Sequence, residues 1–390
     1  MRHYAVEDEV RVGLDRSLRD WQKAGLLTSA QEPLLRADLA TGLRRTGLML
    51  RLGLAAFTVI AGAATFGLIV LATNMSSEIA TAFTATALGA AAWGTATLLA
   101  RSGRLYRYGV EEALVMGAVA LFGFAAALLG AEAIDSNSVG VAWCFAMTTA
   151  AIAAGAAYRL FGFQYAAVGA LYATALLPMA SRSVGTEFKR VFAAVVCAAG
   201  YAAATRLRQR AVDDVRQGDA EVVRAAAAVG AYLALNAFVL PEWFSRTVAD
   251  WFRWSSGPMV WLLPVAFGRA AVVERDPLLV RVALAAALAT LVTNKAYLGW
   301  PRQPWDPVLL GVGLVALSLG LRRWLSAGAD GERNGFTARP LVDSDAAAVQ
   351  LGSLISVATP PTEPARPAPG PDDPYFSGGR SGGAGAGGTF

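Results

Sequence analysis

The chain has 390 residues, of which 55% are hydrophobic and 16% are charged, and its mean hydropathy is +0.44. A soluble globular domain carries about 25% charged residues, and its apolar residues recur at the period of a helix or a strand. Here they form unbroken runs of about 16 to 22 residues, which excludes an ordinary soluble protein and predicts a polytopic α-helical membrane protein.

The net charge of +5 lies at the ends of the apolar runs. This distribution suits the lipid bilayer and its anionic lipids as partners, and it does not suit nucleic acid. Cys144 and Cys197 each lie inside an apolar run, so a disulfide framework is not expected. The first fifty residues are polar, and we therefore expect no cleavable signal peptide.

Residues 1–51 predict a short cytosolic helical hairpin, broken at Gly25. Thr28 or Ser29 caps the second helix, with Gln31 or Glu32 reaching back as the third residue of a capping box. The expected apolar faces are Val6, Val10, Leu14, Leu18 and Trp21 on the first helix, and Leu27, Leu34, Leu35, Leu39 and Leu43 on the second.

Residues 52–325 predict an all-α transmembrane helix bundle of about ten spans, with a range of eight to ten. The segments are 52–73, 79–100, 113–130, 139–158, 162–180, 191–205, 222–240, 258–273, 278–294 and 307–321. The sixth is short for a hydrocarbon core about 30 Å thick, and the eighth contains Pro264 and Arg269. The short link after residue 73 predicts an antiparallel first pair.

We expect the spans to pack through small residues, since these let helix backbones approach closely in lipid. The candidates are Gly62, Gly89, Gly117, Gly155 and Gly169.

Arg and Lys concentrate in the connections on one side of the predicted bundle, beginning with the N-terminal segment. By the positive-inside rule both termini are cytosolic, and the protein is a multi-pass protein of the bacterial cytoplasmic membrane. The connection 181–190 is the exception, because Arg182, Lys189 and Arg190 fall on the opposite side. On the cytosolic side, residues 206–221 predict a solvated helix with pairs such as Arg210 and Asp214.

Two intramembrane polar residues stand out. Asn236 either joins helices through its amide or contacts a substrate. Arg269 is expected to be the most central charge, and it either snorkels to the cytosolic surface or lines a transport path. Pro178 and Pro264 would supply the kinks of such a path. The acids Glu111 and Glu112 are expected to be end-of-helix groups at the headgroups.

His3 is the only histidine, and it precedes the spans. Serine–histidine catalysis and a histidine zinc site therefore lack their key residue, and no Gly-rich phosphate loop is present. The sequence predicts no catalytic, cofactor-binding or metal-binding residue, no cofactor and no enzymatic activity.

Aromatic residues gather on the predicted outer side. Phe244, Val248, Trp251 and Phe252 share a face and predict an amphipathic helix in the outer headgroups. The candidate outer-face aromatic surface comprises Trp243, Trp251, Trp254, Trp300 and Trp305. It fits either an aromatic belt or a shallow surface for lipid, glycan or peptide.

Residues 326–390 are rich in Pro, Gly, Ser and Asp and predict a disordered cytosolic tail. Residues 21–31, with the sequence WQKAGLLTSAQ, resemble the start of a bacterial family of predicted polytopic inner-membrane proteins of unknown function. Members open with a tryptophan, a basic residue, a Gly-Leu-Ile turn and a Gln- or Glu-led helix, and Leu27 stands here in place of the usual isoleucine. The resemblance implies an inner-membrane location and carries no activity.

With no recognisable chemistry in the spans, the exposed ends are the distinctive parts of the chain. They predict a non-enzymatic interaction or envelope-organising component, with a protein partner at the N-terminal hairpin or the C-terminal tail. A small-molecule or lipid transporter is the alternative.

Overall fold

The computed structural model describes residues 3–23, 28, 31–73, 77–133, 138–181, 183–211, 214–239, 249–299, 303, 305–328, 332–333 and 336–337. The chain divides into two units, Met1–Ser318 and Leu319–Phe390. In the second unit, β1 (Glu332–Arg333) pairs antiparallel with β2 (Phe336–Thr337). Most of the predicted tail, residues 338–390, lies outside the described residues.

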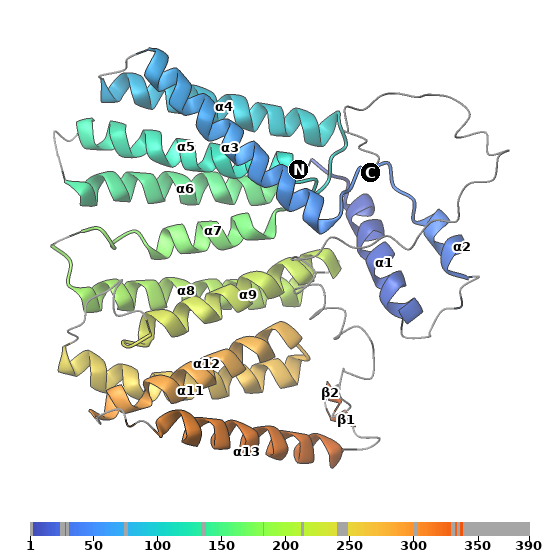
Figure 1. Ribbon diagram of the computed structural model, residues 1–390, viewed down its shortest axis with the longest axis vertical. Coiled ribbons are helices and arrows are strands. Elements are labelled where there is room, and N and C mark those ends of the chain that lie inside the picture. The colour runs from blue at the N-terminus through green and yellow to red at the C-terminus, as the bar shows by residue number, and fades with distance from the viewer. Residues whose placement is uncertain are drawn as a thin grey trace, which may run out of the picture. The chain divides into compact units, whose positions relative to one another are not determined.

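The first unit is a bundle of long helices that lie side by side in chain order (Figure 1). Its helices are α1 (Val6–Lys23), α2 (Gln31–Asp38), α3 (Leu48–Ala72), α4 (Glu78–Arg101), α5 (Val110–Ala133), α6 (Val139–Phe161), α7 (Gln164–Ala175), α8 (Thr186–Arg210), α9 (Asp214–Leu235), α11 (Asp250–Glu274) and α12 (Pro277–Leu298). The helix α13 (Asp306–Ser326) begins in this unit and ends in the second. Alanine dominates the buried positions, so neighbouring backbones approach closely.

Seven described helices are long and apolar enough to cross a membrane: α3, α4, α5, α6, α8, α11 and α12. The all-helical bundle with membrane-spanning character is therefore confirmed. Each of the ten predicted segments coincides with a helix, and the sixth and eighth segments, as α8 and α11, are among the seven. By contrast, α7 has only 12 residues and α9 opens with charged residues.

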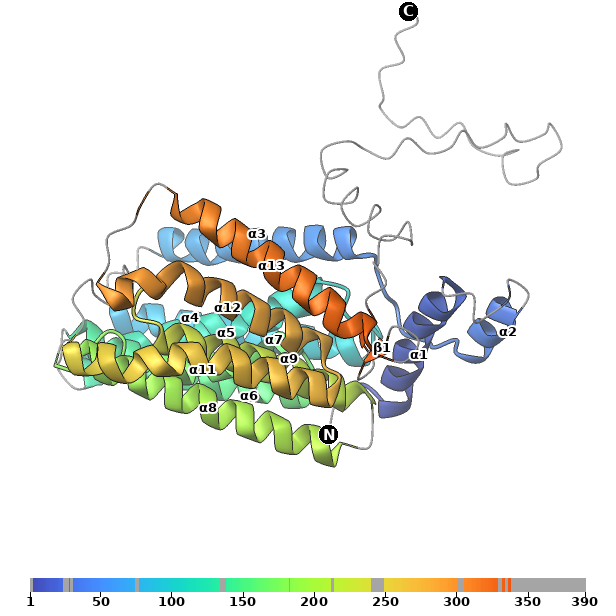
Figure 2. The ribbon, with the colours of Figure 1, turned by 90° about the horizontal axis from the view of Figure 1, so that it is seen from below.

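The bundle has two chemically distinct ends. One, the charged end, holds the first turns of α3, α5, α7, α9 and α12 and the last turns of α4, α6, α8 and α11. The helices α1 and α2 lie beyond it (Figure 2). The other, the aromatic end, holds the start of α11, the end of α12 and Trp305.

One predicted feature of the N-terminal helices is confirmed, whereas the end of the second helix and the buried face of the first differ from the prediction. The capping box is confirmed, since Thr28 Oγ1 accepts from Gln31 N at 3.3 Å and Gln31 Oε1 accepts from Thr28 N at 3.1 Å. However, α2 ends at Asp38 instead of continuing to Leu43. The backbone after α2 forms hydrogen bonds with the loop between α4 and α5. Arg44 N donates to Arg104 O at 2.9 Å, and Tyr106 N donates to Arg44 O at 3.0 Å.

The buried face of α1 is also rotated from the predicted one. Glu9, Val12, Asp15 and Leu18 are buried, whereas Trp21 is exposed. The reason is that α1 packs on a charged surface: Asp15 pairs with Arg45 at 3.0 Å and with Arg36 at 3.5 Å. Carboxylates therefore occupy positions where an apolar hairpin would place aliphatic side chains.

Of the five glycines predicted to mediate packing, only Gly89 does so: a Cβ atom at this position would lie 2.9 Å from the Phe122 ring. Gly62, Gly117, Gly155 and Gly169 face open space. Close approach occurs instead at positions such as Gly123, where a Cβ would lie 3.2 Å from the Ala146 carbonyl oxygen. In addition, α3 packs chiefly on α5 and only slightly on its chain neighbour α4.

Gly109 connects the loop after α4 to α5. It has a φ of +105°, and a Cβ there would overlap the Arg51 carbonyl oxygen. Replacing Gly109 by Ala should therefore destabilise the protein by about 1–3 kcal/mol, which thermal unfolding in detergent measures. Replacing Gly155, which lies inside α6 with nothing within 4 Å, by Ala should be neutral or stabilising by up to about 1 kcal/mol. Equal loss in both variants would contradict this account.

Candidate functional site

A buried arginine organises the charged end of the bundle. Arg224 of α9 is fully buried and pairs with Glu274, the last residue of α11, and with Asp276, which precedes α12. Arg208 of α8 donates to the same Glu274 at 2.6 Å and to Glu221 at 3.1 Å. Four helices therefore meet at two arginines and three carboxylates.

The local sequence places these carboxylates. Asp276 caps α12, since its Oδ1 accepts from Leu278 N at 2.9 Å and from Leu279 N at 3.0 Å, with Pro277 in the first turn. This leaves Asp276 Oδ2 free to face Arg224. Arg275 adopts a left-handed φ of 56°, which makes the tight turn that brings Glu274 and Asp276 to the same cation.

A second buried carboxylate lies in the first turns of α9. Asp219 is fully buried, and it accepts from Gln164 Nε2 at 2.8 Å and from the Tyr158 hydroxyl at 3.3 Å. The predicted solvated helix over 206–221 is therefore wrong. Helix α8 ends at Arg210 and α9 begins at Asp214, and the side chain of Asp214 lies outside the described residues.

Glu111 and Glu112 lie in the first turn of α5, as expected of end-of-helix groups, and both are buried within the protein. Glu112 pairs with Arg51 of α3, whose Nε donates to Glu112 Oε2 at 2.5 Å. Glu111 Oε1 accepts from Tyr108 N at 2.6 Å, so it caps the start of α5. These acids hold helix ends together, because an unpaired charge at this depth would be costly.

The segment before α1 covers this end of the bundle. His3 N donates to Leu160 O at 2.7 Å, and the Tyr4 hydroxyl donates to Leu105 O at 2.8 Å. His3 Nδ1 accepts from Arg101 Nε at 3.0 Å, and its ring meets Phe161 edge-on at 4.7 Å. Burial, and next the Arg101 charge, lower the pKa of His3 from its usual 6.5.

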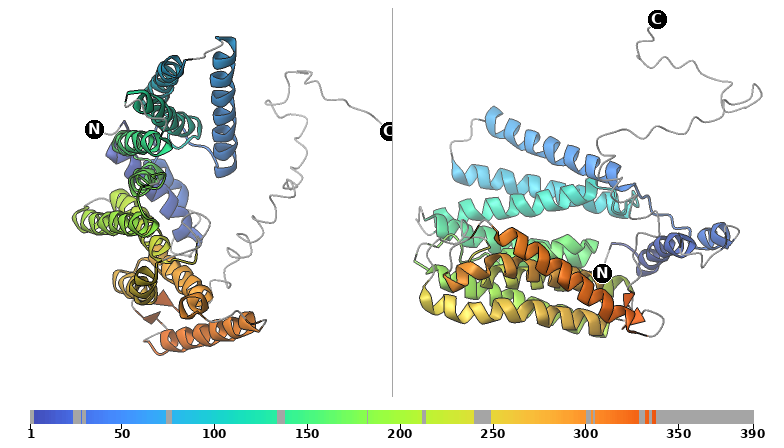
Figure 3. Two further views of the ribbon diagram at one scale, coloured as in Figure 1. Left: turned by 90° about the vertical axis from the view of Figure 1, so that its left-hand side faces the viewer. Right: turned by 60° about the horizontal axis from the view of Figure 1, so that its bottom comes forward.

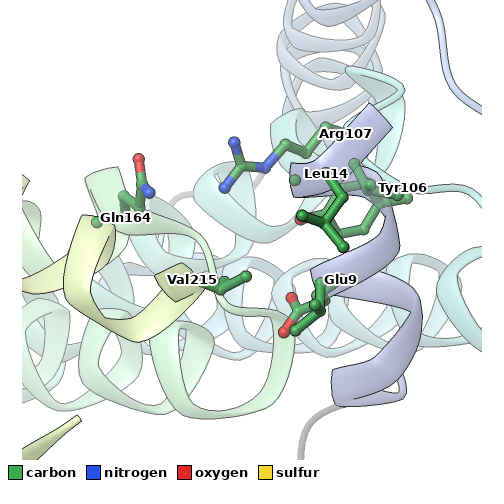
Figure 4. Close-up of a pocket in the computed structure, with 10 residues that line it drawn as sticks. Glu9, Leu14, Tyr106, Arg107, Gln164 and Val215 are labelled. Carbon is green, nitrogen blue, oxygen red and sulfur yellow. The ribbon is translucent and has the colours of Figure 1, made fainter. Parts of the chain in front are cut away.

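A pocket of about 230 Å³ lies beneath α1. Its polar lining comes from Glu9 of α1, Arg107 of the loop before α5, and Gln164 of α7. Figure 4 shows Glu9 and Arg107 on the α1 side, with Gln164 and Val215 across the space. The pocket is below the range of about 300–1,000 Å³ typical of ligand sites. It offers one cation, one carboxylate and one amide.

At the aromatic end, Asn236 is the centre of a polar cluster. It is fully buried, and its Nδ2 donates to the Tyr232 hydroxyl at 2.9 Å and to Thr293 Oγ1 at 3.0 Å. Its Oδ1 accepts from Phe238 N at 3.1 Å. The amide therefore joins α9 to α12 and stabilises the turn that follows α9.

Arg190 of α8 caps the carbonyls at the end of α9. Its guanidinium donates to Ala234 O at 3.3 Å, Asn236 O at 3.1 Å and Ala237 O at 3.2 Å. Its neighbour Lys189 donates to Met179 O at 2.9 Å. The last carbonyls of a helix have no intrahelical partner and need such donors. Of the three basic residues of the connection 181–190, Lys189 and Arg190 therefore serve an internal structural role, and Arg182 lies outside the described residues.

The other predicted site residues that the structure describes lie on the surface. Arg269 is exposed on α11, about 20 Å along that helix from Ser256, which contacts Tyr297 of the Asn236 end. The structure therefore does not bring Arg269 and Asn236 together, and the most deeply buried arginines are Arg190 and Arg224.

The described tryptophans of the aromatic surface, Trp251, Trp254 and Trp305, are all exposed at the aromatic end. Lys295 Nζ lies 5.5 Å from the Trp305 ring centroid. Trp251 and Trp254 belong to the first turns of α11, and Phe252 is buried, so they do not form the face of a separate helix with it. Trp243 and Trp300 lie outside the described residues.

Within the described part of the chain, no group of three or more His, Cys, Asp or Glu residues could hold a metal ion. Neither protein-family models nor curated proteins show any match to this sequence.

The arginine cluster is the feature that reasoning from sequence missed. Its signal was present: Arg224 lies inside the seventh predicted segment, and a charge at that depth requires a carboxylate partner. Glu274 and Asp276, which lie in the link between the eighth and ninth segments, were the available acids.

Replacing Arg224 by Met would leave Glu274 and Asp276 without their buried cation. We expect a loss of about 3–5 kcal/mol in stability, measured by thermal or denaturant unfolding in detergent. Replacing the exposed Arg269 by Met is the matched control, with a change within about 0.5 kcal/mol. Equal tolerance of both substitutions would show that the cluster does not hold the helices together.

The lowered pKa of His3 predicts an acid-sensitive N-terminal contact. The unfolded chain binds a proton at a higher pH than the folded one, so the stabilisation is complete above the usual pKa of about 6.5 and is lost as the pH falls from there toward the folded-state pKa. Protection of residues 3–23 from proteolysis should fall between pH 8 and pH 5. His3→Gln, which keeps an acceptor for Arg101 without titrating, should flatten that dependence, and an unchanged pH profile would exclude His3 as the cause.

Proposed function

We propose that the protein is a ten-span, non-enzymatic component of the bacterial cytoplasmic membrane that recruits a protein partner at its cytosolic ends. The N-terminal helical pair α1 and α2 is the principal recruiting surface, and residues 326–390 are a second one.

The ten-span reading rests on the course of α7. Although this helix covers only about 18 Å, the chain continues through a turn to Ser181. Gln164 lies near the end of α6, and Ser181 lies beside Gly140 at its start, where a Cβ on Gly140 would be 3.1 Å from Ser181 Cα. We infer that residues 164–181 form a crossing alongside α6. Counting this segment, α9 and α13 with the seven apolar helices gives the proposed ten spans.

An even number of crossings puts both termini on one side, and the excess of Arg and Lys favours the cytosol. The capping roles of Lys189 and Arg190 support this orientation, since these residues are engaged by carbonyls of the bundle. The resemblance of residues 21–31 to the inner-membrane family supports the same location.

The observation that carries the recruiting role is the uncovered apolar surface of the N-terminal helices. Leu34 and Leu35 of α2 are 70% and 39% exposed, and Trp21 at the end of α1 is 42% exposed. No residue of α2 is buried. These helices lie outside the apolar spans, where grouped exposed apolar side chains mark an interaction surface.

The test is crosslinked co-purification from the native host. Leu34→Glu should abolish capture of a near-stoichiometric protein partner, because it places a charge in the apolar contact. Ala40→Glu is the matched control, since it adds the same charge at an exposed position beyond the end of α2 and should retain the partner. Equal capture by both variants, or recovery of lipid alone, would overturn the proposal.

A chain ending at Leu325 tests the second surface in the same assay. Loss of a partner on truncation assigns that partner to the tail, and retention assigns it to α1 and α2.

Transport of a small molecule or lipid is the second candidate, because α7 is a short helix of 12 residues that packs against α9. Interrupted spans form binding sites in many transporters. A carrier would tolerate removal of the tail and lose activity on substitution of Asn236 or Arg269. The full engagement of the Asn236 amide within the bundle favours the recruiting role.

A further inference from the structure

An apolar cavity of about 440 Å³ lies between α3, α4 and α5. Its lining includes Gly62 and Phe66 of α3, Leu88 and Ala92 of α4, and Gly117 and Leu121 of α5. This volume falls within the range of about 300–1,000 Å³ that ligand sites occupy. Figure 3 shows α3 running along the flank of α4 and α5.

Two contacts fix α3 against α5 on either side of the cavity. At the charged end, Arg51 pairs with Glu112, and its carbonyl oxygen lies against Gly109. About 22 Å further along α3, the Phe66 ring meets Phe124 edge-on at 6.0 Å between centroids. Between these contacts α3 has no buried residue.

The glycines on both walls keep the cavity open. A Cβ added at Gly62 or at Gly117 would meet no atom within 4 Å. Because α3 and α5 have the highest mean hydropathy of the seven apolar helices, the space lies at the depth of lipid chains and must be filled by apolar groups. Its lining extends from residue 58 to residue 66 on α3 and from residue 113 to residue 121 on α5, about 12 Å along each helix, which accommodates part of an acyl chain.

The charged end of the cavity is basic. The segments that lead into α3 and α5 pair through Arg44 and Leu105, and they carry Arg44 and Arg104 on their exposed sides. Arg51, by contrast, is held by Glu112. Exposed arginines at the headgroup level attract anionic lipid heads.

We propose that one acyl chain of an anionic phospholipid occupies the cavity between α3, α4 and α5, with its phosphate at Arg44 and Arg104. The site differs from annular lipid contact because two walls of the cavity come from helices fixed to each other at both ends. The lipid then acts as a structural ligand of the first three spans, independently of any protein partner at α1 and α2.

The first test is photo-crosslinking of the full-length protein in vesicles that contain a phosphatidylglycerol with a diazirine in one acyl chain. We expect adducts concentrated in peptides covering residues 58–66 and 113–121. Adducts spread evenly over the exposed faces of all spans would overturn the proposal. A phosphatidylcholine carrying the same chain should label the site several-fold less.

The second test fills the cavity. Gly62→Leu and Gly117→Leu should each reduce labelling several-fold. Gly67→Leu is the matched control: Gly67 also lies on α3 with nothing within 4 Å, but it does not line the cavity. Equal labelling of the Gly62 and Gly67 variants would exclude the site. A change of oligomeric state with Gly62→Leu but not with Gly67→Leu, without loss of labelling, would instead assign the cavity to a second copy of the chain.

The third test addresses the headgroup. Replacing both Arg44 and Arg104 by Gln should remove the preference for phosphatidylglycerol over phosphatidylcholine while leaving chain labelling at residues 58–66. A preserved preference would show that these arginines do not bind the phosphate.

Discussion

Neutralisation of Arg224 is the constraint around which the charged end of the bundle is built. A cation inside an apolar helix is costly unless it is paired and hydrogen-bonded. The turn Glu274-Arg275-Asp276-Pro277 supplies two carboxylates to it, and the same turn ends α11 and starts α12. Arg208 then shares Glu274, so α8 is fixed by the same charge that fixes α9, α11 and α12. The ion pairs and hydrogen bonds around the Arg224 guanidinium therefore hold α8, α9, α11 and α12 together.

At the aromatic end, side chains satisfy buried backbone groups in the same way that carboxylates neutralise the buried arginine at the charged end. Helix α9 ends at Leu235, and its last carbonyls are satisfied by Arg190, while the Asn236 amide and the Tyr297 hydroxyl bond the turn that follows. Non-helical backbone at this depth persists only where protein donors and acceptors replace water. Two arginines therefore position α9: Arg224 near its middle through carboxylates, and Arg190 of α8 at its end through carbonyls.

The half of the bundle around α3 is held differently. The helix α3 itself has no buried residue, and its contacts with α5 and the loop before α5 include the Arg51–Glu112 pair, the close approach at Gly109 and the Phe66–Phe124 contact. This sparse packing leaves an apolar cavity, whereas the α9 half is filled by hydrogen-bonded polar side chains. The two halves therefore differ: polar side chains fill the interior around α9, whereas the cavity beside α3 has room for a lipid chain.

The sequence by itself determined the all-helical membrane fold and the positions of ten helices, because unbroken apolar runs allow little else. It also determined local features such as the Thr28–Gln31 capping box, which depends on residues three apart. Only the tertiary structure decided which glycines mediate packing, which face of α1 is buried, and that Arg224 and Asn236 are buried and engaged while Arg269 is exposed. All of these depend on residues outside the element itself, and the partners of the two buried polar residues lie more than 50 residues away: Asp276 for Arg224 and Thr293 for Asn236. The pattern of apolar residues along one helix does not show which residues of other helices will be its partners.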